Sequence, residues 1–358
     1  MVGRYYIDPD RKVLKIHEWP EHDRALWEAA LQQDDPFSES GNRNNYRKIS
    51  NDKVAKGHGR FLNYIKRYRP THFNVRPHER LSEQLIKDYV EHLRSLQNSD
   101  QTIIDRLQEL YSIHQILAPN QSLTFIRRIE SRIRSRAKPV REKRGRLVPS
   151  DELVSLGKKL METSSQLSTE RLRAIQFRDG LIIAFAALRP WRRKNLAEMQ
   201  ISKSVIKKNG KWMLVLSKEE TKTYSRDERT WPDVLVSELE MYLAIHRPVL
   251  MAQTGRWTSP VGNYLWVSSE SSPQTQMSIY QQITKRTKEE FGVSINPHLF
   301  RDAAATTIAI EDPTHVGIGT CVLNHRSART TEKYYQQAQQ QRAHTKFSEF
   351  IQAARQKR

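Results

Sequence analysis

The sequence has few of the features that mark secreted, membrane-bound or metal-dependent proteins. It contains one cysteine, Cys321, in 358 residues, which excludes an internal disulfide and a thiolate-rich metal site. Its longest apolar run, Leu181 to Leu188, is well short of the ~18 residues that span a bilayer. The beginning of the chain lacks the apolar segment of a signal peptide. We therefore expect a soluble protein of the reducing cytoplasm, with no metal and no membrane partner.

Acidic residues are too few to balance the basic ones. Lys and Arg number 60 against 40 Asp and Glu, which gives a net charge of +20. An excess of this size favours nucleic acid as the partner, through phosphate neutralisation and counterion release. A basic but otherwise ordinary surface is the alternative. The sequence has no Walker loop, no Gly-rich nucleotide loop and no H-E-x-x-H motif, so we expect no cofactor.

The first part of the chain has the periodicity of a small helical domain. Residues 1–45 are polar and irregular, and this N-terminal extension has no assigned role. Basic and aromatic residues then alternate from Asn45 to Arg69. Apolar residues recur at helical spacing in Leu81–Leu96 and Gln101–Leu117, and a third helix is expected over Ser122–Arg136. Residues 46–137 are therefore expected to form a helical, positively charged domain that binds DNA.

Positive charge is concentrated between residues 127 and 146, with ten Arg or Lys and two Glu. Pro139 and Gly145 interrupt helical continuity there, so residues 138–148 are interpreted as a basic linker. We expect it to lie along a DNA backbone, because a tether between two DNA-binding domains is brought to the duplex. A solvated hinge is the alternative. The expected DNA contacts are Arg132, Arg134, Arg136, Lys138, Arg141, Lys143, Arg144 and Arg146.

A second domain is expected over residues 149–358, and its composition is mainly helical. Pro149–Glu152 has the pattern of a helix start, with Ser150 as N-cap and two acids in the first turn. The helix from Thr169 to Leu188 is apolar on nearly all sides at its end, so it should be buried. Ser278 and Gln281 have the spacing of a capping box for a helix that ends near Phe291.

A small antiparallel sheet is expected within this second domain. Ile201–Lys208 and Lys211–Ser217 flank Asn209-Gly210, which is a strong signal for a two-residue type I′ hairpin. A third short strand is expected around Thr230. The predicted fold class is therefore mainly α with a small antiparallel β-sheet.

Four clusters of residues carry a family resemblance. They are L-R-P-W-R-R-K-N-L-A-E-M (188–199), T-K-T (221–223), H-L-F-R-D (298–302) and L-N-H followed by T-T-E-K-Y (323–334). Together they resemble the boxes of the tyrosine recombinases, or phage integrase family, in order and in spacing. The resemblance covers about residues 150–340, and the basic helical region before it is similar to the family's core-binding domain.

The resemblance implies six catalytic residues: Arg192, Lys222, His298, Arg301, His325 and Tyr334. Two guanidinium groups suit the non-bridging oxygens of a phosphodiester, because they bind bidentately and stay charged. The histidines can donate to the same oxygens, and His298 can assist proton removal from the phenol. Lys222 would protonate the departing 5′ oxygen while Tyr334 attacks to form a 3′-phosphotyrosine. That linkage conserves the bond energy, so rejoining needs neither ATP nor metal.

Three of these assignments have a neighbouring alternative: Arg189 for Arg192, Lys218 for Lys222, and Tyr335 for Tyr334. Adjacent tyrosines point about 100° apart on a helix, so only one of them can reach the phosphate. The spacing from His325 selects Tyr334.

Three positions depart from the family pattern or stay open. Asn324 replaces the usual glycine before the second histidine, and Asn195 stands where many members carry an acid. Asp302 either orients Arg301 or lies on a helix surface. None of these changes removes a catalytic group, so we expect an active enzyme.

The resemblance also implies how the protein works. We expect a C-shaped clamp around DNA, and a homotetramer on two synapsed sites that exchanges strands through a Holliday junction. The free protein would be a monomer or weak oligomer, with accessory DNA-bending or directionality factors as further partners. Integration or excision of a mobile genetic element, at the nucleoid, is the expected role. The tail helix, residues 344–358, either docks on a neighbouring subunit or packs on its own domain. A type IB topoisomerase, a telomere resolvase and a decayed, non-catalytic DNA-binding regulator remain alternatives.

Overall fold

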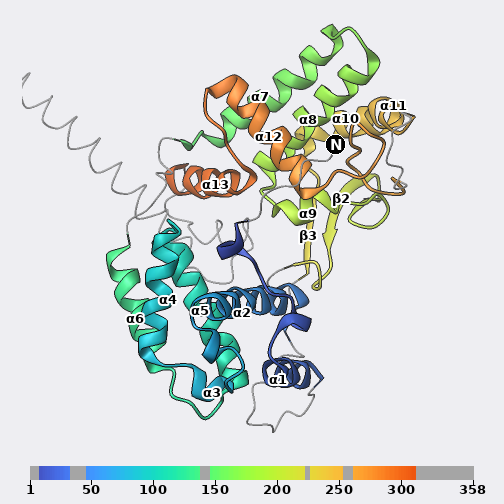
Figure 1. Cartoon of the computed structure of the whole chain (residues 1–358). Coiled ribbons are helices and arrows are strands. Elements are labelled where there is room, and N and C mark those ends of the chain that lie inside the picture. Colours follow the sequence, from blue (N-terminus) through green and yellow to red (C-terminus); the bar gives the residue numbers. More distant parts are fainter. Residues whose placement is uncertain (1–7, 33–45, 138–145, 222–225, 253–260, 312–358) are drawn as a thin grey trace, which may run out of the picture. The chain divides into compact units, whose positions relative to one another are not determined.

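The computed structural model describes residues 8–32, 46–137, 146–221, 226–252 and 261–311. Its contacts divide the chain into two compact units, Met1–Arg141 and Glu142–Arg358, which we call the helical unit and the sheet-containing unit (Figure 1). The described residues are mainly helical and include one three-stranded antiparallel sheet. This confirms the predicted fold class. Among them, no helix combines the length and apolar character needed to cross a membrane.

The helical unit is built around one long helix, α5. Its elements are η1 (Pro9–Arg11), η2 (Ile16–Glu18), α1 (Glu21–Gln32), α2 (Lys48–Tyr68), η3 (Pro70–His72), α3 (Pro77–Arg80), α4 (Glu83–Ser95), α5 (Asp100–Leu117) and α6 (Thr124–Arg136). α5 contacts α1, α2, α3, α4 and α6, and its apolar residues are buried on more than one side. Ser82 and Ser99 cap α4 and α5 through their hydroxyl groups, as short polar side chains do at helix starts. The helices predicted near residues 81–96, 101–117 and 122–136 are therefore present.

Part of the N-terminal extension belongs to the core of the helical unit. Leu14, Trp19 and Trp27 are almost fully buried and pack with residues of α2 and α5. The indole of Trp19 also donates to the carbonyl of Leu14 at 3.2 Å. Residues 8–32, to which the sequence assigned no role, thus contribute large apolar side chains to this unit.

A buried ionic cluster joins three helices of the helical unit. Arg80 of α3 donates to both carboxylate oxygens of Asp23 of α1, at 2.7 and 2.8 Å. His58 of α2 lies 2.7 Å from the same carboxylate, and all three side chains are fully buried. Burial alone raises the pKa of Asp23, but hydrogen bonds from Arg80 and His58 outweigh it and hold that pKa well below its usual range. The carboxylate is therefore charged and paired, which is the arrangement that makes a buried ion tolerable.

The sheet-containing unit is organised around α8. Its helices are α7 (Ser150–Thr163), η5 (Ser164–Gln166), α8 (Glu170–Leu188), α9 (Arg193–Ala197), η6 (Asp233–Leu235), α10 (Val236–Met241), a π-helical turn η7 (Tyr242–His246), α11 (Arg247–Met251), α12 (Gln276–Phe291) and α13 (Pro297–Glu311). α8 contacts α7, α11, α12, α13 and η7. A Cβ added to Gly157 of α7 would lie 2.6 Å from the carbonyl oxygen of Gly180 of α8, so two glycines allow these helices to approach closely.

Charged side chains inside this unit fix α8 against α12. Asp179 of α8 is fully buried and accepts from Arg178 and from Arg286 of α12, whose guanidinium donates at 3.1 Å. α12 itself begins one turn earlier than the sequence suggested. Thr275 is its N-cap and forms a capping box with Ser278, so the predicted box of Ser278 and Gln281 is wrong. The hydroxyl of Thr275 accepts a hydrogen bond from the backbone N–H of Ser278 at 3.0 Å. Ser278 therefore already lies in the first helical turn and is not the N-cap.

The sheet has the order β1 (Val205–Lys208), β2 (Lys211–Leu216), β3 (Asp227–Thr230), with antiparallel pairs throughout. Asn209 and Gly210 both have positive φ, 49° and 75°, which is the signature of the predicted type I′ turn. β1 begins at Val205 rather than at Ile201, because residues 201–204 form a separate turn that ends in the hydrogen bond from Ser202 N–H to the carbonyl of Val205.

Candidate phosphodiester site

The first arginine box forms the sharp connection between α8 and α9. Arg189 is the C-cap of α8 and Arg192 the N-cap of α9, so the two arginines lie at the two ends of a short turn. Trp191 between them is buried, and its ring lies edge-on to that of Phe185, with the ring centroids 6.0 Å apart. The apolar end of α8 thus packs against this turn through Trp191. The side chain of Arg192 is half-buried.

The H-x-x-R motif occupies the first turns of α13. Asn296 accepts the backbone N–H groups of His298 and Leu299 on its side-chain oxygen, an arrangement typical of a helix N-cap. His298 is exposed, whereas Arg301 is 7% exposed and donates to the carbonyl of Pro190. This hydrogen bond joins the motif to the arginine box, which lies 111 residues earlier in the chain.

A second hydrogen bond brings the turn after β2 to the same place. The side-chain amide of Asn195 donates to the carbonyl of Glu220 at 3.2 Å. Glu220 is held in turn by Lys203 at 2.8 Å and by the backbone N–H of Ser217 at 2.9 Å. Thr221 is buried, so the chain is fixed immediately before the position of the predicted lysine.

These contacts assemble three of the four predicted boxes from separate parts of the chain. The arginine box, the segment that leads to Lys222 and the H-x-x-R helix meet through Arg301, Pro190, Asn195 and Glu220. Lys222 itself, His325 and Tyr334 lie outside the described residues. So do the alternative nucleophile Tyr335 and the departure from the family pattern at Asn324.

The structure describes the surroundings of Arg189, the alternative to Arg192, and of Asp302, for which two interpretations were open. Arg189 donates to the carbonyl of Thr230 at the end of β3 through two nitrogens, at 3.3 Å each, and to that of Leu188 at 3.1 Å. Burial lowers its pKa. Arg301 donates to a backbone carbonyl in the same way, so Arg192 stays the predicted phosphate ligand and Arg189 its alternative. Asp302 is 3% exposed, so the interpretation of this residue as a helix-surface group is wrong.

Of the two lysine alternatives, the structure describes Lys218. Lys218 has a 70% exposed side chain and lies 3.9 Å from its neighbour Glu219. Lys222, which follows the segment held by Asn195, remains the prediction.

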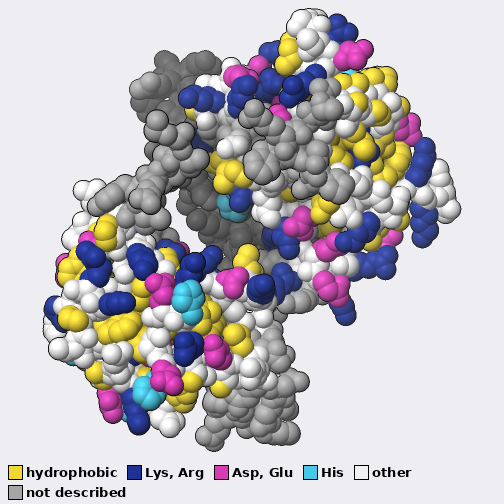
Figure 2. Space-filling model, turned by 45° about the vertical axis from the view of Figure 1, so that its right-hand side comes forward, with side chains coloured by type: hydrophobic (Ala, Val, Ile, Leu, Met, Phe, Trp, Pro, Cys, Tyr) yellow, Lys and Arg dark blue, Asp and Glu magenta, His cyan; other side chains and the backbone are white. Residues whose placement is uncertain are grey.

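A basic groove lies between α4 and α6 in the helical unit. This α4–α6 groove has a volume of about 280 Å³ and is lined by Lys87, Val90, Glu91, Arg94, Asp100, Ile129, Arg132, Ile133 and Arg136. Two predicted DNA contacts, Arg132 and Arg136, therefore lie in a depression with two cations of α4. Lys and Arg side chains are spread over both units on the face that Figure 2 shows, with Asp and Glu between them.

The remaining predicted DNA contacts are divided between described and undescribed segments. Arg134 of α6 is exposed and paired with Glu130 at 2.7 Å. Arg146 donates to the carbonyl of Ser294 at 2.5 and 3.2 Å, so its guanidinium secures the loop before α13. Lys138, Arg141, Lys143 and Arg144 lie outside the described residues. The groove also contains Lys87 and Arg94, which were not among the predicted contacts, although their spacing of seven residues places them on one face of α4.

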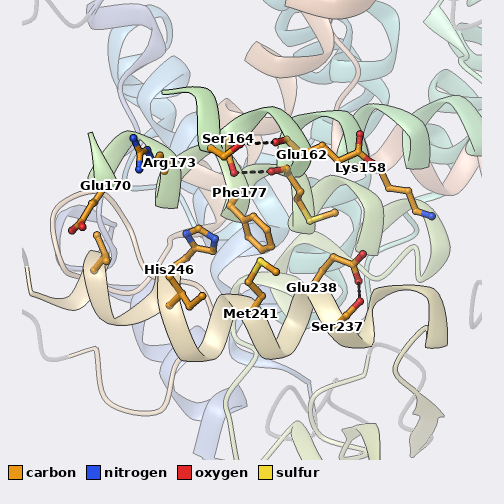
Figure 3. A pocket seen from close by; sticks show the side chains of 14 residues that line it. Lys158, Glu162, Ser164, Glu170, Arg173, Phe177, Ser237, Glu238, Met241 and His246 are labelled. Atoms are coloured by element: carbon orange, nitrogen blue, oxygen red, sulfur yellow. Dashed lines mark hydrogen bonds between the residues drawn. The ribbon is translucent and has the colours of Figure 1, made fainter. Parts of the chain in front are cut away.

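A larger cavity, of about 650 Å³, lies in the sheet-containing unit near the beginning of α8. Phe177 and His246 stack there with ring centroids 4.1 Å apart, and Met241 lies beside them (Figure 3). The predicted catalytic residues do not line it. Phe177 and Arg189 are twelve residues apart, or about 18 Å along a helix, so cavity size does not locate the phosphodiester site.

Comparison with solved structures gives the class to which this fold belongs. The chain matches site-specific recombinases and a transposon integrase over most of its length, and so has the fold of the tyrosine recombinases. In particular, it resembles the XerH site-specific recombinase bound to difH substrate in a pre-cleavage complex, with a TM-score of 0.56 and 14% identity over 92% of this chain and 95% of that one. It also resembles the Tn1549 transposon integrase in complex with circular intermediate DNA, with a TM-score of 0.54 and 13% identity over 87% and 94%. No protein-family model and no curated protein matches the sequence.

Proposed function

We propose that the chain is a site-specific DNA recombinase that cuts and rejoins duplex DNA through a 3′-phosphotyrosine. The observation that carries this proposal is the convergence of the arginine box, the turn before Lys222 and the H-x-x-R helix. Spacing within any one box is common by chance. Two hydrogen bonds that bring three ordered boxes to one place are much less so.

The proposed reaction begins with the grip on one phosphate. Arg192 and Arg301 neutralise the non-bridging oxygens, and a preorganised pair of cations stabilises the extra charge of the transition state. Arg301 is buried and its guanidinium is already oriented by the carbonyl of Pro190, so little reorganisation accompanies DNA binding. His298 and His325 donate to the same oxygens.

The chemical steps balance without a cofactor. The phenol oxygen of Tyr334 attacks phosphorus, its proton passes to His298 or to solvent, and the bond from phosphorus to the 5′ oxygen breaks. Lys222 supplies a proton to that oxygen, which leaves as a 5′-hydroxyl. Attack of a 5′-hydroxyl from another strand on the phosphotyrosine reverses these steps and releases Tyr334. A Holliday junction forms when the strands come from two sites, and we propose a tetramer that exchanges them in pairs.

The helical unit is proposed to hold the duplex next to the reacting phosphate. Lys87, Arg94, Arg132 and Arg136 line one groove, which suits a phosphate backbone better than it suits an apolar partner. Integration or excision of a mobile element is the role that we propose for the exchange.

An exchange assay tests the function. Duplexes that the protein binds are enriched from a random pool, and two copies of the enriched site are placed on one supercoiled plasmid. We expect deletion or inversion between the copies, in the absence of ATP and with a chelator present. Relaxation of the plasmid without exchange would instead indicate a type IB topoisomerase, closed hairpin ends a telomere resolvase, and binding without either a regulator.

Neutralising the α4–α6 groove is expected to change the salt dependence of DNA binding. In Arg132→Gln/Arg136→Gln, the slope of log affinity against log salt concentration should become shallower by about 2, since each lost phosphate contact removes about 0.9. Equilibrium binding of a duplex is measured between low and moderate salt. Arg171→Gln/Arg173→Gln, at the start of α8, removes the same charge from the other unit and should keep the wild-type slope. Equal slopes in the wild type and the groove variant would show that the groove does not contact the backbone.

A further inference from the structure

A second small cavity lies in the helical unit, where η1, α2, α4 and α5 meet. Its volume is about 80 Å³, room for roughly two to three water molecules or one group of phosphate size. The side chains that matter among its lining are those of Arg11, Arg60, Arg106, Tyr89, His92 and Asp10. None of them belongs to the predicted catalytic or DNA-binding residues. We call it the Tyr89 cavity.

The cavity contains a buried hydroxyl group with nothing to bind. Tyr89 is 1% exposed, and its phenol oxygen has no hydrogen-bond partner among the described residues. The ring packs against Phe61 and Tyr64, each with a centroid distance of 5.1 Å. Leaving such a group unsatisfied costs stability, and native proteins usually reserve that arrangement for a water or a ligand.

Positive charge is in excess beside this hydroxyl. The carboxylate of Glu109 forms a salt bridge with Arg106 at 2.7 Å. The guanidinium of Arg60 lies 3.6 Å and the ammonium of Lys53 4.0 Å from the same carboxylate. One carboxylate thus faces three cations. Burial lowers the pKa of Arg60 and the charge of Arg106 lowers it further, and the carboxylate of Glu109, which Arg60 shares with Arg106, offsets this only in part.

The one carboxylate of the cavity lining, Asp10, has partners of its own. Asp10 is engaged by Arg67 at 2.6 Å and by the hydroxyl of Tyr68 at 2.9 Å. Arg11 donates to the carbonyl of Leu96, which holds a third guanidinium at the opening. The cavity is therefore small, its charged lining consists of three arginines and Asp10, and Tyr89 with its buried hydroxyl forms part of its wall.

We propose that the Tyr89 cavity binds one phosphate group, with the hydroxyl of Tyr89 and the guanidinium of Arg60 as its donors. The phosphate comes either from a DNA backbone or from free phosphate in solution. Both present the same oxygens to the same donors. The DNA source rests on the proposed function of the chain, whereas the free source is independent of it.

Tyr89→Phe gives the sharpest test, because it removes only the unpartnered oxygen. The melting of the full-length protein is followed while inorganic phosphate is titrated at constant ionic strength against chloride. We expect phosphate to stabilise the wild type saturably, and Tyr89→Phe and Arg60→Gln to weaken its binding about tenfold or more. In chloride alone, Tyr89→Phe should melt at the wild-type temperature or above it, since it loses no hydrogen bond. Arg76→Gln, an exposed arginine of the same unit, should behave as wild type.

A second measurement, of duplex binding against salt concentration, separates the two sources of phosphate. If the backbone supplies the phosphate, Arg60→Gln should also make the salt dependence of duplex binding shallower by about 1. If free phosphate is the ligand, that slope should stay unchanged while the response to phosphate is lost. Either result supports the cavity whether or not strand exchange occurs. The proposal is overturned if phosphate stabilises the wild type no more than chloride and the slope is unaltered. A lower melting temperature of Tyr89→Phe in chloride would also overturn it, because the hydroxyl would then have a protein partner.

Discussion

Replacing Tyr334 with phenylalanine is expected to abolish the covalent protein–DNA adduct that the wild-type protein forms on a nicked duplex. The substitution keeps the ring and removes only the oxygen that attacks phosphorus. In the nicked substrate, cleavage releases a short strand with its 5′-hydroxyl, so rejoining is prevented and the adduct accumulates. The labelled strand should run at the mass of a protein–DNA species on a denaturing gel with wild type, and at the mass of free DNA with the variant.

The adjacent phenol provides the matched control for this result. Tyr335→Phe should form the adduct at the wild-type level, and both variants should bind the duplex as tightly as wild type does. Loss of the adduct in Tyr335→Phe alone would make that residue the nucleophile. An undiminished adduct in both variants would refute phenol attack by this pair.

Asp23→Asn is expected to cause the largest loss of stability in the helical unit. It leaves Arg80 charged, fully buried and without its carboxylate, and breaking a buried pair in this way costs about 3–5 kcal/mol. Hydrogen exchange of the full-length protein, read on peptides from α1, α2 and α5, should become faster by about a hundredfold or more. The apolar packing of Trp19 and Trp27 is unchanged by the substitution, so the effect reports the ionic cluster.

An exposed ion pair of the same unit supplies the comparison. Asp10 pairs with Arg67 at 2.6 Å with side chains 23% and 42% exposed, and Asp10→Asn should cost less than about 1 kcal/mol. The pKa of Asp23 is depressed in the folded state, so its contribution is present above about pH 4 and shrinks as the pH falls further. Similar exchange rates in the two variants at neutral pH would show that the cluster contributes little.

The parts of the fold that were predicted are those set by local sequence. Asn209-Gly210 requires two positive φ values, so the hairpin follows from two adjacent residues. Apolar spacing likewise located α4, α5 and α8. The start of α12 was misplaced because Thr275 and Ser278 satisfy the same end of the helix that Ser278 and Gln281 could have satisfied.

The parts that were not predicted depend on contacts between distant residues. Asp23 meets His58 and Arg80 across 35 and 57 residues, and the sequence shows only three unrelated polar residues. No periodic pattern indicates that a polar stretch near the beginning of the chain pairs with them. The candidate site is similar. Residue types and their order identified Arg301, but the contact with Pro190 is a property of the tertiary structure.

Both hydrogen bonds that assemble the candidate site end on main-chain carbonyls, those of Pro190 and Glu220. Every amino acid presents the same carbonyl, so the two acceptors themselves do not depend on the side chains of residues 190 and 220, although the carboxylate of Glu220 also pairs with Lys203 and accepts from Ser217. The donors Asn195 and Arg301 are the restricted partners. Such a site tolerates extensive drift in its surroundings, which suits a fold shared with recombinases at 13–14% identity. A substitution of Glu220 is therefore expected to keep the acceptor for Asn195 while it removes the contacts with Lys203 and Ser217.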